Sequence, residues 1–322
     1  MGTLDKLQTF IMLFAVGLGL LLGQVNIIEQ YAVNLITPFL LLMLYGLFLT
    51  IPLKQLRKAF SNIKFLGANT IINFLWTPVL AWGLGSIFLS DYPALWIGFI
   101  MLMVTPCTDW YLAFTSIAKG NVSLSTSVLP INLILQVILL PVYLLIFAGT
   151  IESIPISTLI ESIVIVLVIP FALAHLTRFL FGKKTVLNNK VIPFFANGQV
   201  FVLSLAIMAM FASQGSYLLE SIEIIYILII PILLFFIINY VVGRFVGKFL
   251  KFSYEDSVSL NMTIIARNSP VSLAIAVTAF PDQPLIALAL VIGPLIELPI
   301  LAIVSQILLF TRKKSENKGY PV

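Results

Sequence analysis

Two apolar segments of this chain are each interrupted by polar residues and a proline. The first interruption consists of Thr105, Pro106, Cys107, Thr108 and Asp109, and the second of Arg267, Asn268, Ser269, Pro270 and Val271. A proline inside an apolar helix removes a backbone donor and frees a carbonyl, which lipid cannot satisfy. Such breaks therefore persist where they line a hydrated cavity inside the protein. We interpret Pro106 and Pro270 as helix breaks at a polar binding site.

The hydroxyl residues next to these prolines are of the type that caps helices. Thr105 and Ser269 each precede a proline, and we predict that each begins a second half-helix. The unpaired N–H groups and the positive dipole ends of two half-helices favour anionic or strongly hydrogen-bonding ligands. The alternative is a simple proline kink in each helix, without a binding role.

Charged residues accompany both breaks and the last apolar segment. Asp109 follows the first break, Arg267 begins the second, and Glu297 lies between two prolines of the final segment. A charge that faced lipid would cost about 2.5 to 3.5 kcal/mol, so we expect each to face the interior with a partner. Arg267 is predicted to pair with Asp109 or Glu297 until substrate or a proton releases it. The alternative is a permanent buried ion pair that fixes helix register.

Cys107 is the only cysteine, so the chain contains no internal disulfide. At the second position of a half-helix and near Arg267, its sulfur would be thiolate-like and face the cavity. The alternative is an inert packing residue. The sequence has no pairing of nucleophile and base and no metal-binding motif, so we expect no catalytic residues, no metal and no cofactor. A membrane enzyme is therefore not expected.

The composition predicts the elements that hold these residues. Of 322 residues, 60% are apolar and 10% are charged, and apolar runs long enough to span a bilayer recur along the chain. The fold class is an all-α polytopic membrane protein. Polar clusters divide it into ten predicted spans, at about residues 7–25, 32–53, 65–89, 93–118, 122–149, 158–181, 190–214, 219–243, 255–280 and 284–311.

Apart from Arg267, the cations lie in alternate connections between these spans or at the termini. They are Lys6, Lys54, Arg57, Lys58, Lys64, Lys119, Arg178, Lys183, Lys184, Lys190, Arg244, Lys248, Lys251, Arg312, Lys313, Lys314 and Lys318. The opposite connections hold acidic residues and no Lys or Arg. The positive-inside rule then places both termini in the cytoplasm, which requires an even number of spans. The net charge of +5 reflects this loop bias and not a nucleic-acid partner.

Ten spans divide into two sets of five, and sets of five must enter the membrane from opposite sides. We predict two inverted five-helix repeats, residues 1–149 and 150–314, followed by a disordered cytoplasmic tail at 315–322. Pro106 and Pro130 have the same separation in sequence as Pro270 and Pro294. Broken helices at matching places of two halves are typical of the substrate site of a secondary transporter.

Several short motifs carry a resemblance to a known family. Pro106-Cys107-Thr108, Lys119-Gly120-Asn121, the downstream Asn132 and the segment from Gly293 to Pro299 are similar to motifs of arsenite efflux permeases in the bile acid:sodium symporter superfamily. The resemblance implies ten helices in two inverted repeats, a panel and a core domain, and crossing of the broken helices 4 and 9. It further implies that Cys107 contacts arsenite and that Glu297 is the acidic residue tied to transport.

The chain departs from the family's patterns at the second break. Sodium-coupled members have a glutamine before the asparagine that Asn268 matches, and a glutamate four residues before that glutamine. Here these positions hold Arg267 and Thr263, so the guanidinium can occupy the place of sodium. Arsenite permeases also typically have Phe-Phe-Glu after the asparagine, where this chain has Ser269, Pro270 and Val271. The resemblance is therefore to a divergent branch.

Two substrate classes follow from these residues. Arsenite is an uncharged, thiophilic hydroxide at neutral pH, and it fits one thiol with the donors of Thr108, Asn132, Asn268 and Ser269. A bile-acid-like or pantothenate-like carboxylate would instead use Arg267 and the half-helix ends, with sodium coupling or none. We favour arsenite export across the plasma membrane with proton antiport through Asp109 or Glu297, while sodium and an uncoupled channel stay open. The expected partners are this small molecule and the lipid bilayer, and the sequence predicts no oligomeric state.

Overall fold

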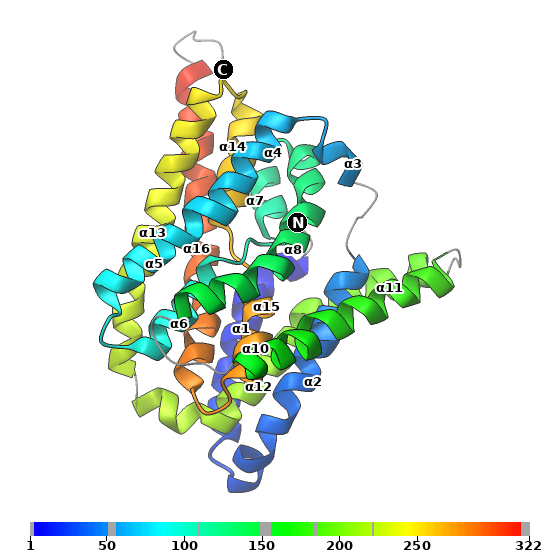
Figure 1. The fold of residues 1–322 in the computed structure, drawn as a ribbon, viewed down its shortest axis with the longest axis vertical. Helices are drawn as coiled ribbons and strands as arrows, with labels where there is room; N and C mark the ends of the chain where they lie inside the picture. The colour runs from blue at the N-terminus through cyan, green and yellow to red at the C-terminus, as the bar shows by residue number, and fades with distance from the viewer. Residues whose placement is uncertain are drawn as a thin grey trace. The chain divides into compact units, whose positions relative to one another are not determined.

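The computed structural model describes residues 3–50, 56–108, 110–148, 156–182, 186–220 and 222–316. Within these ranges the chain is helical and forms no β-strand, as the sequence predicts (Figure 1). The only extended pairing in the described ranges is an isolated antiparallel bridge between Pro106 and Arg267. Asp109, one of the predicted charged site residues, lies outside the described residues.

Seven helical stretches of the described chain are long and apolar enough to cross a membrane. They are Asn26–Thr50, Ile63–Phe88, Val122–Phe147, Ile160–Phe181, Leu187–Gln214, Tyr226–Phe249 and Pro284–Arg312. Each overlaps one of the predicted spans, although Asn26–Thr50 and Tyr226–Phe249 are displaced from the predicted 32–53 and 219–243. The other three predicted spans contain shorter helices: the first is α1 (Thr3–Leu22), and the fourth and ninth are each divided in two.

Both predicted helix breaks are present. The fourth predicted span consists of α6 (Pro93–Met103) and α7 (Trp110–Ile117), and the ninth of α14 (Tyr254–Ile265) and α15 (Ser269–Ala279). Each of these helices is too short to cross a bilayer by itself. The polar residues of the two breaks therefore lie within otherwise apolar stretches of chain.

The remaining helices complete the order of elements. They are α2 (Asn26–Thr50), α3 (Leu56–Ala59), α4 (Ile63–Ile71), α5 (Thr77–Phe88), α8 (Val122–Tyr143), α10 (Ile156–Ile163), α11 (Ile169–Phe181), α12 (Ile192–Glu220), α13 (Ile222–Phe249) and α16 (Pro284–Glu316). Four short π-helical segments continue neighbouring helices: η2 (Ile72–Trp76), η3 (Leu144–Ala148), η4 (Val164–Val168) and η5 (Leu187–Val191). In this way α4, η2 and α5 form one uninterrupted span.

The chain forms two compact units, and each draws on both halves of the sequence. Unit 1 contains residues 1–51, 152–226 and 270–291, and unit 2 contains residues 52–151, 227–269 and 292–322. The two compact units therefore differ from the predicted division into residues 1–149 and 150–314. That division concerns inverted repeats and stays a prediction. Of the predicted tail, residues 317–322 lie outside the described residues, whereas α16 continues to Glu316.

In unit 1, α12 packs along α2 and α1, and α11 packs against α2. Side chains near the end of α11 also form hydrogen bonds with residues near the end of α2. Arg178 donates to the carbonyl of Leu49 through Nε at 2.8 Å and Nη2 at 2.5 Å, and Tyr45 donates to Thr177 Oγ1 at 2.9 Å. A cation at a helix C-terminus is favourable because the last carbonyls have no partner within the helix.

In unit 2, α14 packs against α4, α7 and α8. Side-chain hydroxyls bind main-chain carbonyls across these contacts. Tyr254 donates to Ala118 O at 3.0 Å, Ser259 to Asn121 O at 3.0 Å, and Tyr111 to Ser125 O at 2.9 Å. Buried hydroxyls thus find acceptors on other elements, which fixes the position of α14 beside the first break.

Two helices of unit 2 end in the same way, with a lysine in the left-handed conformation. Lys119 follows α7 and Lys251 follows α13, and each has a φ angle of 56°. At the second of these ends, Lys251 N donates to Lys248 O at 3.1 Å and Phe252 N donates to Gly247 O at 2.9 Å. This pair of bonds is the Schellman motif, in which glycine is the usual left-handed residue. Both chain reversals therefore carry a side chain at a position that favours glycine.

Candidate functional site

The two helix breaks meet within unit 2 and satisfy each other's main chain. Cys107 N donates to Ala266 O at 3.0 Å, and Asn268 N donates to Thr105 O at 2.7 Å. The bridge between Pro106 and Arg267 lies between these two bonds. A break inside a membrane helix frees backbone groups that must find partners in the protein. Here each break supplies partners for the other, so the two breaks form one site.

The first break is longer than the sequence predicts, and two predictions about it are wrong. Thr105 does not cap a helix that begins at Pro106, because the chain stays extended and the next helix begins at Trp110. The Thr105 hydroxyl donates to carbonyls instead, among them Leu102 O at 3.0 Å and Asn268 O at 3.2 Å. Cys107 accordingly lies in the extended stretch and not at the second position of a half-helix.

The second break is closer to its prediction. Asn268 lies in the non-helical stretch, and α15 begins at Ser269 with Pro270 in its first turn. Ser269 is therefore the first helical residue of α15 and not its N-cap, so the helix begins one residue earlier than predicted. Proline is well suited to this first turn because its missing N–H would have no partner there.

Arg267 is the most heavily bonded side chain of the site, and it is 2% exposed. Its Nε donates to Ile265 O at 3.1 Å and its Nη1 to Met103 O at 2.9 Å. Nη2 donates to Asn73 Oδ1 at 2.9 Å and also to Ile264 O. The guanidinium further lies over the ring of Phe235, with Cζ 5.4 Å from the ring centroid.

The acceptors of Arg267 explain how a charge is held in this apolar region. Met103 is the last residue of α6, and Ile264 and Ile265 are the last residues of α14. The guanidinium therefore lies at the C-terminal ends of two helices, where carbonyl oxygens without helical partners and negative dipole ends favour a cation. The sequence predicts that Arg267 needs an acidic partner, but the helix ends provide much of its neutralisation.

Glu297 contacts the second break through the main chain. Its Oε1 accepts a hydrogen bond of 2.9 Å from Arg267 N, and the side chain is 2% exposed. Among the described residues no ion pair within 4.0 Å joins Glu297 to the Arg267 guanidinium. Of the two predicted partners of Arg267, Glu297 is thus adjacent but binds the peptide group and not the guanidinium.

A chain of buried amides leads from Arg267 to Asn132. Asn73 Nδ2 donates to Asn69 Oδ1 at 3.0 Å, and Asn69 Nδ2 donates to Asn132 Oδ1 at 2.6 Å. All three asparagines are 0% exposed. The amide orientations follow from this network, since Arg267 can only donate to an oxygen of Asn73. Asn132 therefore belongs to the same site as the two breaks.

Sequence reasoning missed Asn69 and Asn73. Both lie in the apolar span Ile63–Phe88, and Asn73 is part of the π-helical segment η2. Their spacing of four residues places them on one face of a helix, and buried amides are rare in apolar spans. That spacing was the available signal, and it would have predicted a polar face directed toward the protein interior.

Two amide groups at the site have no hydrogen-bond partner within the part of the chain that the structure describes. They are Nδ2 of Asn132 and Nδ2 of Asn268, and the latter side chain is 4% exposed. Unpaired buried donors are costly, so their presence in one site indicates a place for an acceptor. Cys107 and Thr108, each 3% exposed, lie in the same break-to-break region of unit 2.

The predicted site residues thus fall into three groups. Those that the hydrogen bonds bring together are Pro106, Cys107, Asn132, Arg267, Asn268 and Glu297. Thr108 and Ser269 are buried next to members of that set in the chain. Pro270 begins the part of the chain that belongs to unit 1, and Asp109 lies outside the described residues.

Comparison with known proteins gives one family and several relatives. Residues 37–221 match the model of the Sodium Bile acid symporter family. The arsenical-resistance protein Acr3 of Corynebacterium glutamicum is 23% identical over 92% of this chain and 86% of its own length. Acr3 of Alkaliphilus metalliredigens is 23% identical over 81% of this chain and 77% of its own. The uncharacterized protein YbaS of Bacillus subtilis is 26% identical over 88% of this chain and 90% of its own.

Proposed function

This chain belongs to the sodium bile acid symporter family and is a multi-pass membrane transporter, and we propose that it exports arsenite. Two relatives that match most of the chain are named arsenical-resistance proteins. The proposal places the protein in the plasma membrane, with both termini in the cytoplasm. It also assigns the site in unit 2 to the core domain of a ten-helix inverted repeat and gives that site alternating access to the two sides.

The hydrogen bonding of Arg267 is the observation that carries the choice of substrate. Its guanidinium already donates to three main-chain carbonyls and to Asn73 Oδ1. A carboxylate substrate would have to displace those acceptors to reach the charge, and that displacement would leave buried carbonyls without donors. A neutral substrate avoids this cost, which supports arsenite over an organic anion.

Several groups at the site suit arsenite. Nδ2 of Asn132 and of Asn268 have no acceptor among the described residues, and each can donate to a hydroxyl oxygen of the substrate. Cys107 supplies a sulfur for the arsenic atom. A single thiol binds arsenic more weakly than a set of thiols would, which suits a substrate that must be released. Thr108 and Ser269 are the further hydroxyls expected to contact it.

Proton antiport is the coupling that the site supports. Glu297 is buried and accepts a hydrogen bond from Arg267 N, so a proton taken up by this carboxylate would alter the main chain of the second break. Asp109 stays a second predicted proton carrier. Sodium is the alternative, but the oxygens that would bind it at the helix ends already bind the guanidinium.

The test uses the fact that the chain has one cysteine. Purified protein is labelled with a maleimide, with and without arsenite, and the rate of labelling reports on Cys107 alone. Arsenite should slow labelling in a concentration-dependent way, whereas a bile acid or pantothenate should not. The variant Cys107→Ser should take no label and should lose arsenite uptake into everted vesicles under an imposed pH gradient.

The matched control is Ser61→Ala, which alters an exposed hydroxyl that donates to Lys58 O in its own turn. This variant should label, be protected and transport as the native chain does. Protection by the carboxylates with none by arsenite would overturn the substrate and favour the organic-anion alternative. Arsenite uptake that follows a sodium gradient and ignores the pH gradient would overturn the coupling.

A further inference from the structure

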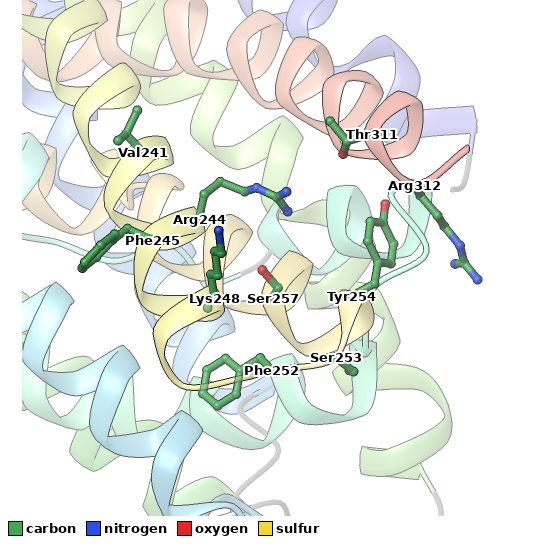
Figure 2. A pocket seen from close by; sticks show the side chains of 11 residues that line it. Val241, Arg244, Phe245, Lys248, Phe252, Ser253, Tyr254, Ser257, Thr311 and Arg312 are labelled. Carbon is green, nitrogen blue, oxygen red and sulfur yellow. The ribbon is translucent and has the colours of Figure 1, made fainter. Parts of the chain in front are cut away.

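An open cavity with basic side chains lies in unit 2, away from the two breaks. It has a volume of about 700 Å³ and is lined by the end of α13, the start of α14 and the end of α16. Figure 2 shows the side chains of Arg244 and Lys248 in this hollow, with Ser257 beside them. A volume of this size is in the range of ligand-binding pockets. The function proposed above makes no use of it.

Beside the cavity, α13 approaches α14 very closely before the chain reverses. A Cβ atom at Gly243 would collide with Asn261, and one at Gly247 would collide with Ser257. These glycines are four residues apart, the spacing that lets helices in membranes pack closely. Arg244 and Lys248 each follow one of them, so both cations lie on the same edge of this contact.

The lining of the cavity is cationic, and its charge is only partly compensated. Arg244, Lys248 and Arg312 line it, and no acidic residue among the described side chains does. Arg312 is held at the rim, 3.6 Å from Glu255 and with Cζ 5.0 Å from the ring centroid of Tyr254. Within the described ranges neither Arg244 nor Lys248 makes an ion pair. Two like charges four residues apart repel each other, so an anion between them would stabilise both.

Polar hydroxyls and an apolar ridge complete the surroundings. Ser257 lines the cavity and is 7% exposed. On α13, an exposed apolar ridge at intervals of four residues leads to the cavity: Leu233, Ile237, Val241 and Phe245. This helix is one of the apolar spans, so the ridge is suited to lipid chains. The three cations also belong to the set that the positive-inside rule assigns to the cytoplasmic side.

We propose that this cavity binds the phosphate group of an anionic phospholipid of the inner leaflet. Arg244 and Lys248 hold the phosphate oxygens, Ser257 donates a hydrogen bond, and an acyl chain follows the ridge from Phe245 to Leu233. Basic pockets between membrane helices on the cytoplasmic side recognise anionic headgroups in this manner. A free phosphate shares the headgroup chemistry but would make no use of the ridge.

The experiment measures lipid retention by native mass spectrometry of the full-length protein, exchanged between phosphatidylglycerol and phosphatidylcholine. The native chain should retain phosphatidylglycerol preferentially. The double variant Arg244→Gln/Lys248→Gln should lose roughly thirtyfold in that preference, as expected for two cations at a membrane surface. The matched control Lys58→Gln/Lys64→Gln removes two exposed cations elsewhere in unit 2 and should keep it.

Folding is checked in parallel by size-exclusion chromatography and by the Tm of each variant. Phosphatidylglycerol should raise the Tm of the native chain and of the control, but not that of the pocket variant. Equal losses of lipid in the pocket and control variants would overturn the proposal, since only net charge would matter. Displacement of the lipid by millimolar inorganic phosphate, with no preference over phosphatidylcholine, would identify a soluble anion site and overturn it as well.

Discussion

Glu297 Oε1 accepts a 2.9 Å hydrogen bond from the main-chain N–H of Arg267, while the Arg267 side chain binds carbonyls at two helix ends. The acidic and the basic side chain of this site are thus adjacent but form hydrogen bonds with different partners. Glu297 fixes the backbone of the second break, and Arg267 neutralises the ends of α6 and α14. Substitutions at the two positions should therefore have separable effects.

Replacing Glu297 should separate structure from coupling. Glu297→Gln keeps an oxygen that can accept from Arg267 N but cannot change its charge, so the fold should persist and arsenite uptake should no longer respond to a pH gradient. Glu297→Ala leaves a buried N–H without an acceptor and should destabilise the protein by about 1 to 3 kcal/mol. Vesicle uptake and unfolding in SDS measure the two effects. Uptake by Glu297→Gln that still follows the pH gradient would assign the proton to another group.

Removing the guanidinium should convert its acceptors into a cation site. Arg267→Gln leaves the carbonyls of Met103, Ile264 and Ile265 without their donor, and we expect a loss of about 1 to 3 kcal/mol in stability for each carbonyl that finds no new partner. Unwound carbonyls at helix C-terminal ends are the type of group that binds sodium in transporters. The Tm of this variant should thus rise in sodium chloride compared with choline chloride, whereas the Tm of the native chain should not. An equal response of both chains would contradict this role of Arg267.

The amide chain predicts a graded response at Asn73 and Asn132. Asn73→Ala removes the acceptor of Arg267 Nη2 and the donor to Asn69, so it should cost about 1 to 3 kcal/mol. Asn132→Ala leaves Asn69 Nδ2 without an acceptor, costs less, and removes a proposed substrate donor. Its main effect should be weaker arsenite protection of Cys107. Unfolding curves and maleimide labelling of the two variants provide the comparison, and equal protection in both would argue against substrate contact by Asn132.

The left-handed lysine after α13 predicts a stabilising substitution. Lys251 has a φ angle of 56°, a conformation that costs a residue with a Cβ roughly 1 to 2 kcal/mol and costs glycine little. After the greater chain entropy of glycine is subtracted, Lys251→Gly should stabilise by about 0.5 kcal/mol. Lys58→Gly, within the helix α3, is the matched control and should destabilise. A lower Tm for Lys251→Gly would show that the lysine side chain contributes more than its backbone costs.

Apolar runs and proline positions were sufficient to predict most helices. The third predicted span, 65–89, coincides with Ile63–Phe88, and the fifth, 122–149, with Val122–Phe147. Span length is set by the thickness of the bilayer, so local composition contains the needed information. The two breaks were predicted for a related reason, since a proline in the interior of a helix removes one of its hydrogen bonds and kinks or ends it.

The geometry within the breaks depends on contacts between distant parts of the chain, which local patterns do not contain. Thr105 was assigned as a cap by helix preferences, yet the chain stays extended through Cys107 because its N–H binds Ala266 O. Likewise, Arg267 was expected to need an acidic partner, because the sequence shows which residues are charged but not which helix ends lie near them. Proline alone does not predict where a helix stops, because α2, α8, α13 and α16 all continue through interior prolines. The polar residues beside Pro106 and Pro270 marked the two breaks, but they did not predict what the freed backbone groups bind.

The peptide group between Ala266 and Arg267 has a partner on each side. Its C=O accepts from Cys107 N, and its N–H donates to Glu297 Oε1. Because a peptide is planar and its polarity is shared between both ends, a change of charge at the carboxylate alters the strength of the bond to Cys107. A single peptide group therefore connects Glu297, the proposed proton carrier, with Cys107, the proposed thiol ligand. Exchange of a proton for a substrate would then need no long chain of intervening residues.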